Sequence, residues 1–104
     1  MAAANYQRAV LRSKESVLKE DLMEIRKAID NYTLDKQAAP QSLDDLVPQY
    51  LHSMPADPIT NAKDWQPVID SVVLTPDQAS SGVTDVHSAS DKVSPFENTA
   101  YNTW

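Results

Sequence analysis

The chain has 104 residues, 15 Asp and Glu against 9 Lys and Arg, and a net charge of −6. This length predicts a single domain, and the acidic surplus argues against nucleic-acid binding because carboxylates repel phosphate. One glycine and no cysteine exclude a glycine-rich phosphate loop and thiolate metal ligands.

The charge is unevenly distributed along the chain. Residues 1–36 carry seven Lys and Arg against six Asp and Glu, whereas residues 37–104 carry two against nine. The basic residues at the start of the chain, Arg8, Arg12 and Lys14, suit either anionic lipid headgroups or neighbouring subunits. No run approaches the roughly 18 apolar residues that crossing a bilayer requires.

Residues 5–38 are predicted to form one long helical arm. This segment contains no Gly or Pro. Its apolar side chains recur at helical spacing, at Leu11, Leu18, Leu22, Ile25, Ile29 and Tyr32. At 1.5 Å per residue the helix would be about 45–50 Å long, longer than a domain of this size is wide. We expect it to end near residues 37–39, because Pro40 disfavours helical geometry in the residue before it.

The apolar stripe of this arm is dense over residues 17–34 and sparse over residues 6–16. We therefore expect the second half of the arm to pack on the chain's own domain and the first half to contact neighbouring subunits. The residues predicted for this subunit interface are Ala9, Val10, Leu11, Arg12 and Glu15.

Residues 39–64 are predicted to hold a short helix and a proline-rich connector. Ser42 is the expected N-cap, with its hydroxyl accepting a hydrogen bond from the amide of Asp45. Acidic residues in the first turn suit the helix dipole. Beyond it, Pro55 and Pro58 make residues 54–58 an extended, rigid connector.

Residues 65–104 are predicted to form a small antiparallel sheet and a C-terminal loop. Short β-branched runs at 68–69 and 72–74 suggest two strands joined by a hairpin turn at Asp70 and Ser71, and residues 83–89 suggest a third strand. Residues 76–81 are expected to form a polar loop, and Gly82 to need a positive φ. Together these elements predict an α+β fold, in which a long N-terminal helix packs on about three strands.

No catalytic constellation is evident in the sequence. His87 lies beside Asp85 and Ser88, but immediate neighbours on a strand point to opposite faces, so His87 and Ser88 are not expected to act as base and nucleophile. His52 lies in a proline-bounded turn, and the two histidines are not at metal-ligand spacing. We therefore do not expect an enzyme, a catalytic residue or a transition-metal site.

Several stretches resemble the major pseudopilins of the type II secretion system, which have a type IV pilin-like fold. The resemblance is carried by LKEDLMEIRKAIDNY at 18–32, Asp35, PQSLDDLV at 40–47, Tyr50 and Leu51, PADP at 55–58, DVHSAS at 85–90 and YNTW at 101–104. It covers nearly the whole chain, and the part from the helix to the proline loop is the most specific.

This resemblance implies a structural subunit that polymerises with identical subunits and with other pseudopilins into a short filament for protein secretion across the outer membrane. It implies a periplasmic domain anchored in the inner membrane by a hydrophobic helix before Asn5, itself preceded by a cleavable leader. Residues 1–4 then resemble an expression start placed on a soluble fragment. The family's filaments are driven by a separate ATPase, so the subunit itself would catalyse nothing and would need no cofactor. The acidic charge noted above is the reason that no nucleic-acid partner is expected.

The sequence departs from this family in the loop that follows the last expected strand. Many major pseudopilins carry a Gly- and Asp-rich calcium loop there, whereas residues 91–98 read DKVSPFEN. Only Asp91 falls where a calcium ligand is expected, which makes it a weak calcium candidate. We expect packing of Phe96, Tyr101 and Trp104, in place of calcium, to hold the loop. Three rival functions stay open: a type IV pilin, a minor pseudopilin, and a free periplasmic binding module with a sizeable apolar pocket.

Overall fold

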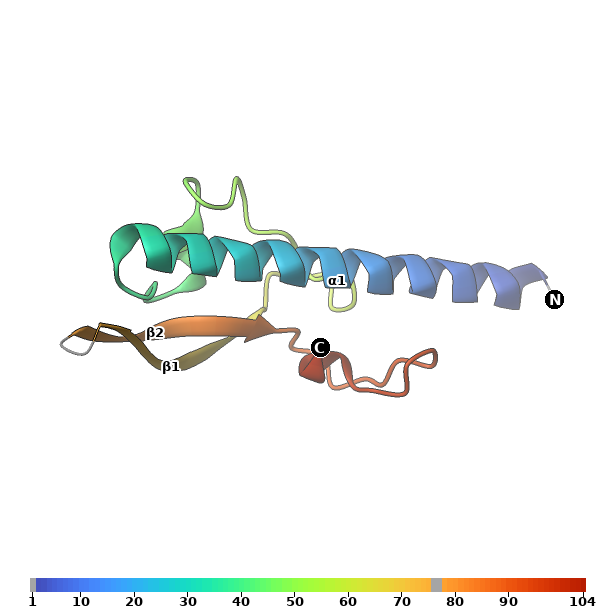
Figure 1. The fold of residues 1–104 in the computed structure, drawn as a ribbon. Coiled ribbons are helices and arrows are strands. Elements are labelled where there is room, and N and C mark those ends of the chain that lie inside the picture. The colour runs from blue at the N-terminus through green and yellow to red at the C-terminus, as the bar shows by residue number, and fades with distance from the viewer. Residues whose placement is uncertain (1, 76–77) are drawn as a thin grey trace.

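The computed structural model describes residues 2–75 and 78–104, with side chains described for residues 5–73 and 81–104 (Figure 1). In chain order the elements are α1 (Ala2–Lys36), the 3₁₀ turn η1 (Leu43–Leu46), β1 (Gln66–Thr75), β2 (Gln78–His87) and the 3₁₀ turn η2 (Tyr101–Thr103). The fold is α+β, one long N-terminal helix packed on an antiparallel sheet.

The long helix α1 forms as expected from its periodicity and its lack of Gly and Pro. It ends at Lys36, and Gln37 adopts a left-handed conformation with φ of 55°. A positive φ at this position terminates a helix, and Pro40 follows three residues later. The helix therefore ends one residue before the predicted range of 37–39.

The core lies along the second half of α1. Five residues from α1 form one buried stripe: Leu18, Leu22, Ile25, Ala28 and Ile29. They pack with residues from the rest of the chain, namely Leu46, Trp65, Val83, Val86 and Tyr101. Trp65 is 5% exposed and donates a hydrogen bond from Nε1 to the Pro55 carbonyl at 2.8 Å.

The sheet is a single hairpin, and β2 lies between α1 and β1 (Figure 1). In the register Gln66 is opposite His87, and Asp70 and Ser71 are opposite Gly82 and Ser81. The predicted turn at Asp70 and Ser71 is therefore wrong, because β1 runs straight through these residues.

Among the described residues the sheet has two strands instead of about three. The expected strands at 68–69 and 72–74 are both parts of β1, and the third expected strand corresponds to the end of β2. Of the loop expected at 76–81, residues 76–77 lie outside the described residues, and residues 78–81 belong to β2.

Gly82 is required for close packing and not for its φ, which is not positive. A Cβ at this position would lie 2.6 Å from the Pro40 carbonyl oxygen and 2.8 Å from Ala39 Cβ. The next residue, Val83, donates its amide to the same Pro40 oxygen at 2.7 Å. The expectation of a positive φ is therefore wrong. Glycine is required at position 82 because residues 39–40 lie against the edge of β2.

The short helix is the 3₁₀ turn η1, with Ser42 at its N-cap as expected. The predicted hydroxyl cap is wrong, because the Asp45 amide donates to the main-chain oxygen of Ser42 at 3.2 Å. Asp45 in turn accepts a hydrogen bond from the Gln41 amide at 2.9 Å, which closes the turn from the other side.

The molecule is elongated. Its principal extents are 61 × 26 × 16 Å, and its radius of gyration is 16.0 Å. A compact domain of this length would have a radius of gyration of about 13 Å. The N-terminal part of α1 extends beyond the hairpin and the C-terminal loop (Figure 1), as the length of the helix requires.

Candidate interaction surfaces

The His87 region is held by structural hydrogen bonds. His87 Nδ1 lies 3.2 Å from the Trp104 carbonyl oxygen, and His87 Nε2 lies 3.8 Å from Asp85 Oδ2. Ser88 is buried and donates its hydroxyl to Asp57 Oδ2 at 2.5 Å, away from His87. The two residues therefore do not form a nucleophile and base pair. His52 is exposed in its turn.

Asp57 is a fully buried carboxylate that organises the connector. Its Oδ1 accepts hydrogen bonds from the amides of Ile59 and Thr60 at 2.8 and 3.4 Å, and its Oδ2 accepts the Ser88 hydroxyl. These bonds tie the turn after the connector to the chain that follows β2. Because these hydrogen bonds satisfy the buried carboxylate, Asp57 has a structural role.

Arg26 joins α1 to β2 and to the C-terminal segment. Its Nε donates to Asp85 Oδ1 at 2.7 Å, and its Nη2 donates to the carbonyls of Val86 and Trp104 at 2.9 and 2.5 Å. Burial raises the pKa of Asp85, but hydrogen bonds from the Val86 amide and Arg26, with the charges of Arg26 and His87, outweigh it and lower the pKa below its usual value. The pair therefore holds Asp85 ionised.

Glu15 lies in a polar pocket inside the molecule. Ser94 donates its hydroxyl to both carboxylate oxygens at 2.9 and 3.0 Å, and Tyr101 donates to Oε2 at 2.7 Å. Burial, followed by the hydrogen bond and charge of Glu15, raises the pKa of Tyr101 to about 12. Glu15 is only 5% exposed, so it is not placed to contact another subunit as expected. It anchors the chain's own C-terminal loop.

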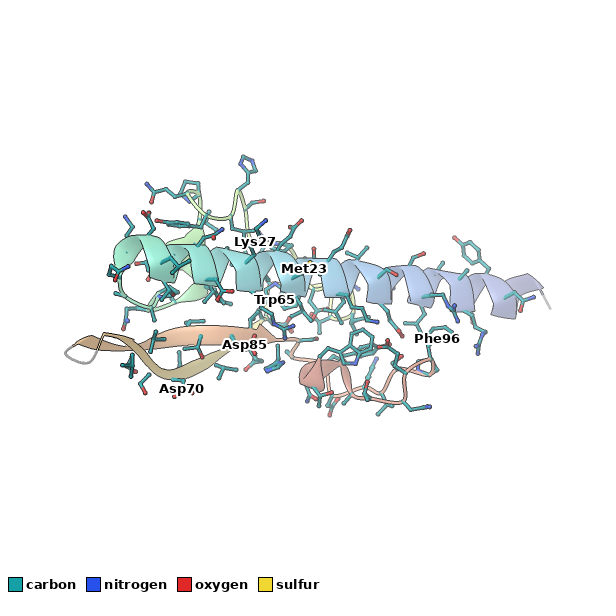
Figure 2. The ribbon with its side chains drawn as sticks, in the orientation of Figure 1. Met23, Lys27, Trp65, Asp70, Asp85 and Phe96 are labelled. Atoms are coloured by element: carbon teal, nitrogen blue, oxygen red, sulfur yellow. The ribbon has the colours of Figure 1, made fainter. Side chains whose placement is uncertain are left out.

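Aromatic packing holds the C-terminal loop, as the sequence favours. Phe96 lies under the first half of α1 (Figure 2), with its ring 5.0 and 4.5 Å from the guanidinium carbons of Arg8 and Arg12. The rings of Tyr101 and Trp104 form an edge-to-face pair with centroids 5.0 Å apart. Arg12, predicted at a subunit interface, therefore contacts this loop.

The calcium candidate Asp91 is exposed, just after β2. In the same loop, Glu97 Oε1 accepts a hydrogen bond from Lys19 Nζ at 2.5 Å, so this carboxylate is already paired. Within the part of the chain that the structure describes, no group of three or more His, Asp or Glu side chains is placed to hold a metal ion.

The first half of α1 presents an apolar surface, which we call the arm stripe: Tyr6, Ala9, Val10, Ser13 and Val17. These residues line an open hollow of about 420 Å³ together with Lys14 and Pro58. Tyr6 is 72% exposed and Val17 is 44% exposed. At 3.6 residues per turn, the arm stripe lies roughly a third of a turn from the buried stripe. Of the predicted interface residues, Ala9 and Val10 belong to it, and half-buried Leu11 lines an adjoining hollow with Tyr6 and Val10.

A second surface, the Trp104 groove, lies against the second half of α1. It has a volume of about 950 Å³ and is lined by Lys19, Leu22, Met23, Arg26, Lys27, Asp30, Glu97, Thr99 and Trp104. Lys19 Nζ lies 4.9 Å from the centre of a Trp104 ring. Met23 and Lys27 project from α1 into the open (Figure 2), and Met23 is 69% exposed.

Sequence reasoning missed this groove. Met23 and Lys27 lie in a helix with clear periodicity, but one wall of the groove comes from residues 97–104, nearly 80 positions further along the chain. The only available signal was that Met23 falls outside the buried 3–4 spacing of Leu18, Leu22 and Ile25.

Comparison with known protein families, with curated proteins and with solved structures finds no match to this chain. Across residues 2–75 and 78–104, no helix combines the length and the apolar character that spanning a lipid bilayer requires. The arrangement of the two surfaces is therefore the main basis for a functional assignment.

Proposed function

We propose that this chain is a structural subunit of a pilus-like filament that serves protein secretion across the outer membrane. The observation that carries the proposal is the arm stripe. It is a largely apolar face on the first half of α1, where Tyr6 is 72% and Val17 is 44% exposed, and Pro58 of the connector lines only part of its hollow. Such a face is typical of a protein-protein contact, because isolated helices bury an apolar stripe against a partner.

The resemblance of the helix, the proline loop and the tail to major pseudopilins supports this reading. So does the elongated shape, in which one rigid helix carries a small domain at one end. In this proposal the subunit stands in the periplasm, is held in the inner membrane by a hydrophobic helix before Asn5, and assembles with identical subunits and other pseudopilins. We assign it no reaction of its own.

The residues that the native gene encodes before Asn5 test this proposal. We expect a cleavable leader followed by a hydrophobic helix long enough to anchor the subunit. A native chain with no membrane-seeking segment upstream would overturn the filament assignment. A type IV pilin or a minor pseudopilin would share this segment, and the genes that flank the native gene distinguish these machines.

A free periplasmic binding module is the second candidate, and the Trp104 groove favours it. A volume of about 950 Å³ is within the range of small-molecule sites. Under this alternative, the native chain lacks a membrane anchor, and the purified monomer binds a small ligand in the Trp104 groove. Thermal-shift screening with a library of anionic and aromatic compounds would separate the two, because the filament subunit is expected to show no specific stabilisation.

A further inference from the structure

The two outer edges of the hairpin are covered differently. On the edge of β2 that faces away from β1, the Val83 amide donates to the Pro40 carbonyl at 2.7 Å, and Gln41 Nε2 donates to the Ser81 carbonyl at 2.8 Å. The outer edge of β1 has no such cover, because across residues 2–75 and 78–104 β2 is the one segment that pairs with it. An uncovered edge strand is a template for a strand of another molecule.

The register shows which residues of β1 direct their main-chain groups to this free edge. In an antiparallel pair, two opposed residues either exchange both main-chain hydrogen bonds or direct these groups away from each other. Ile69 is opposite Val83, and Ser71 is opposite Ser81. Val83 and Ser81 bond to the segment on the far side of β2. The amides and carbonyls of Ile69 and Ser71 therefore face the free edge.

The sequence of this edge favours strand pairing except at one residue. Residues 68–75 read VIDSVVLT, in which Ile69 is 58% exposed and Val73 is 71% exposed. Long, uncharged, β-branched edge strands readily pair with other strands. Asp70 is the exception, since it is the one charged residue in β1 (Figure 2). Its Oδ1 accepts the Ser71 amide at 2.8 Å, which occupies a donor that the free edge would otherwise offer.

We infer that Asp70 guards the free edge of β1 against strand addition by a second copy of this chain. Its carboxylate occupies the Ser71 amide, and its charge opposes the approach of an identical strand. This role goes beyond the proposed function, and it holds whether or not the chain assembles into a filament.

A second copy is the partner that the guard must exclude, because the edge is self-complementary. Two antiparallel β1 strands related by a two-fold axis at Ser71 place Ile69 of one copy opposite Val73 of the other. Val73 follows Ile69 and Ser71 in the alternation of the strand, so both members of this pair face the shared edge. The same register places Asp70 opposite Val72 and leaves the two Asp70 carboxylates as diagonal neighbours, about 7–8 Å apart.

Substitution of Asp70 tests the inference through self-association. Asp70→Thr removes the charge and the acceptor of the Ser71 amide, and introduces a residue that favours strands. In sedimentation velocity we expect a dimer dissociation constant about tenfold lower than that of the parent chain, because the substitution acts at two symmetric positions. The matched control is Asp91→Thr, which makes the same charge change at an exposed residue after β2 and should sediment like the parent.

Engineered cysteines test the strand edge itself, because the chain has no cysteine of its own. In the Asp70→Thr chain, Ser71→Cys places two cysteines directly opposite each other, with Cα atoms about 5.5 Å apart, which a disulfide spans. We expect the disulfide dimer to form about tenfold faster than for Ser71→Cys alone, since pairing raises the effective concentration of the thiols. Val73→Cys in the Asp70→Thr chain is the positional control. It should link slowly, because the register separates the two positions by four residues, roughly 13 Å.

Three results would overturn the inference. Equal self-association of Asp70→Thr and the parent chain would show that Asp70 does not restrain the edge. Equal self-association of Asp70→Thr and Asp91→Thr would show that net charge, and not the position of the charge, controls association. Linking through position 73 at least as fast as through position 71 would show that the copies meet through another surface.

Discussion

The two halves of α1 are covered in different ways. Its second half buries Leu18, Leu22, Ile25 and Ile29 against apolar side chains of the connector and of β2. Its first half is covered on one side only, by the C-terminal loop, through the Glu15 pocket and the Phe96 ring beneath Arg8 and Arg12. The apolar side of that half, the arm stripe, stays open. Apolar burial thus fixes the fold in one half and leaves a partly exposed apolar surface in the other.

Truncation of a core residue is the strongest way to test this difference. Leu22→Ala removes a 1% exposed side chain from the middle of the buried stripe, and we expect a loss of about 2–5 kcal/mol in the free energy of unfolding. The matched control Val10→Ala, in the arm stripe, should change it by no more than about 0.5 kcal/mol. Urea denaturation followed by circular dichroism measures both. Similar losses for the two variants would mean that the arm stripe is covered in solution.

The Glu15 pocket is where the C-terminal loop is attached to the covered side of the first half of α1. Tyr101→Phe removes one of the two side chains that donate to this buried carboxylate, and we expect a loss of about 1.5–3 kcal/mol because the bond involves a charged group. Tyr6→Phe is the control, since Tyr6 is 72% exposed, and it should have no measurable effect on denaturation. An unchanged stability for Tyr101→Phe would show that the loop is not anchored through Glu15.

The sequence predicts the arm well because the relevant information is local. Spacing of apolar residues and the absence of Gly and Pro predict α1, and Pro40 limits how far it can extend, although the helix ends earlier, at the left-handed Gln37. The strands are predicted less well. Asp70 and Ser71 interrupt a β-branched run and resemble a turn, but their cross-strand partners Ser81 and Gly82 keep β1 continuous. Strand pairing depends on such partners, which local sequence does not reveal.

The same difference between local and distant information applies to the residues of the candidate surfaces. Ala9 and Val10 line the arm stripe, and their role at a subunit interface stays a prediction. Glu15 is instead buried, because its partners Ser94 and Tyr101, about 80 residues away in sequence, enclose it. Gly82 was also misinterpreted, since its small size is required by Ala39 and Pro40. In each case, a contact between distant segments decided the role of the residue.

High pH should weaken the attachment of the C-terminal loop. The pKa of Tyr101 is raised from 10.0 to about 12 in the folded state. The folded chain therefore keeps its proton where the unfolded chain loses it, so the stabilisation is present below pH 10 and declines as the pH rises from about 10 to 12. Tyr50, bonded to Asp35, titrates in the same range. We therefore expect Tyr101→Phe to reduce the decline and not to abolish it, as measured by thermal unfolding at each pH.

The smallest expected effect lies in the covered half, at the Arg26–Asp85 pair. The pKa of Asp85 is lowered in the folded state, so its stabilising contribution is present above the unfolded value of 3.8 and is lost as the pH falls below it. Because both side chains are partly exposed, Asp85→Asn should cost less than about 1 kcal/mol at neutral pH. The variant should also unfold with a shallower dependence on pH in the acid range than the parent chain. An unchanged dependence would indicate that Arg26 is held mainly by the carbonyls of Val86 and Trp104, and that these two bonds join the hairpin and the tail to α1.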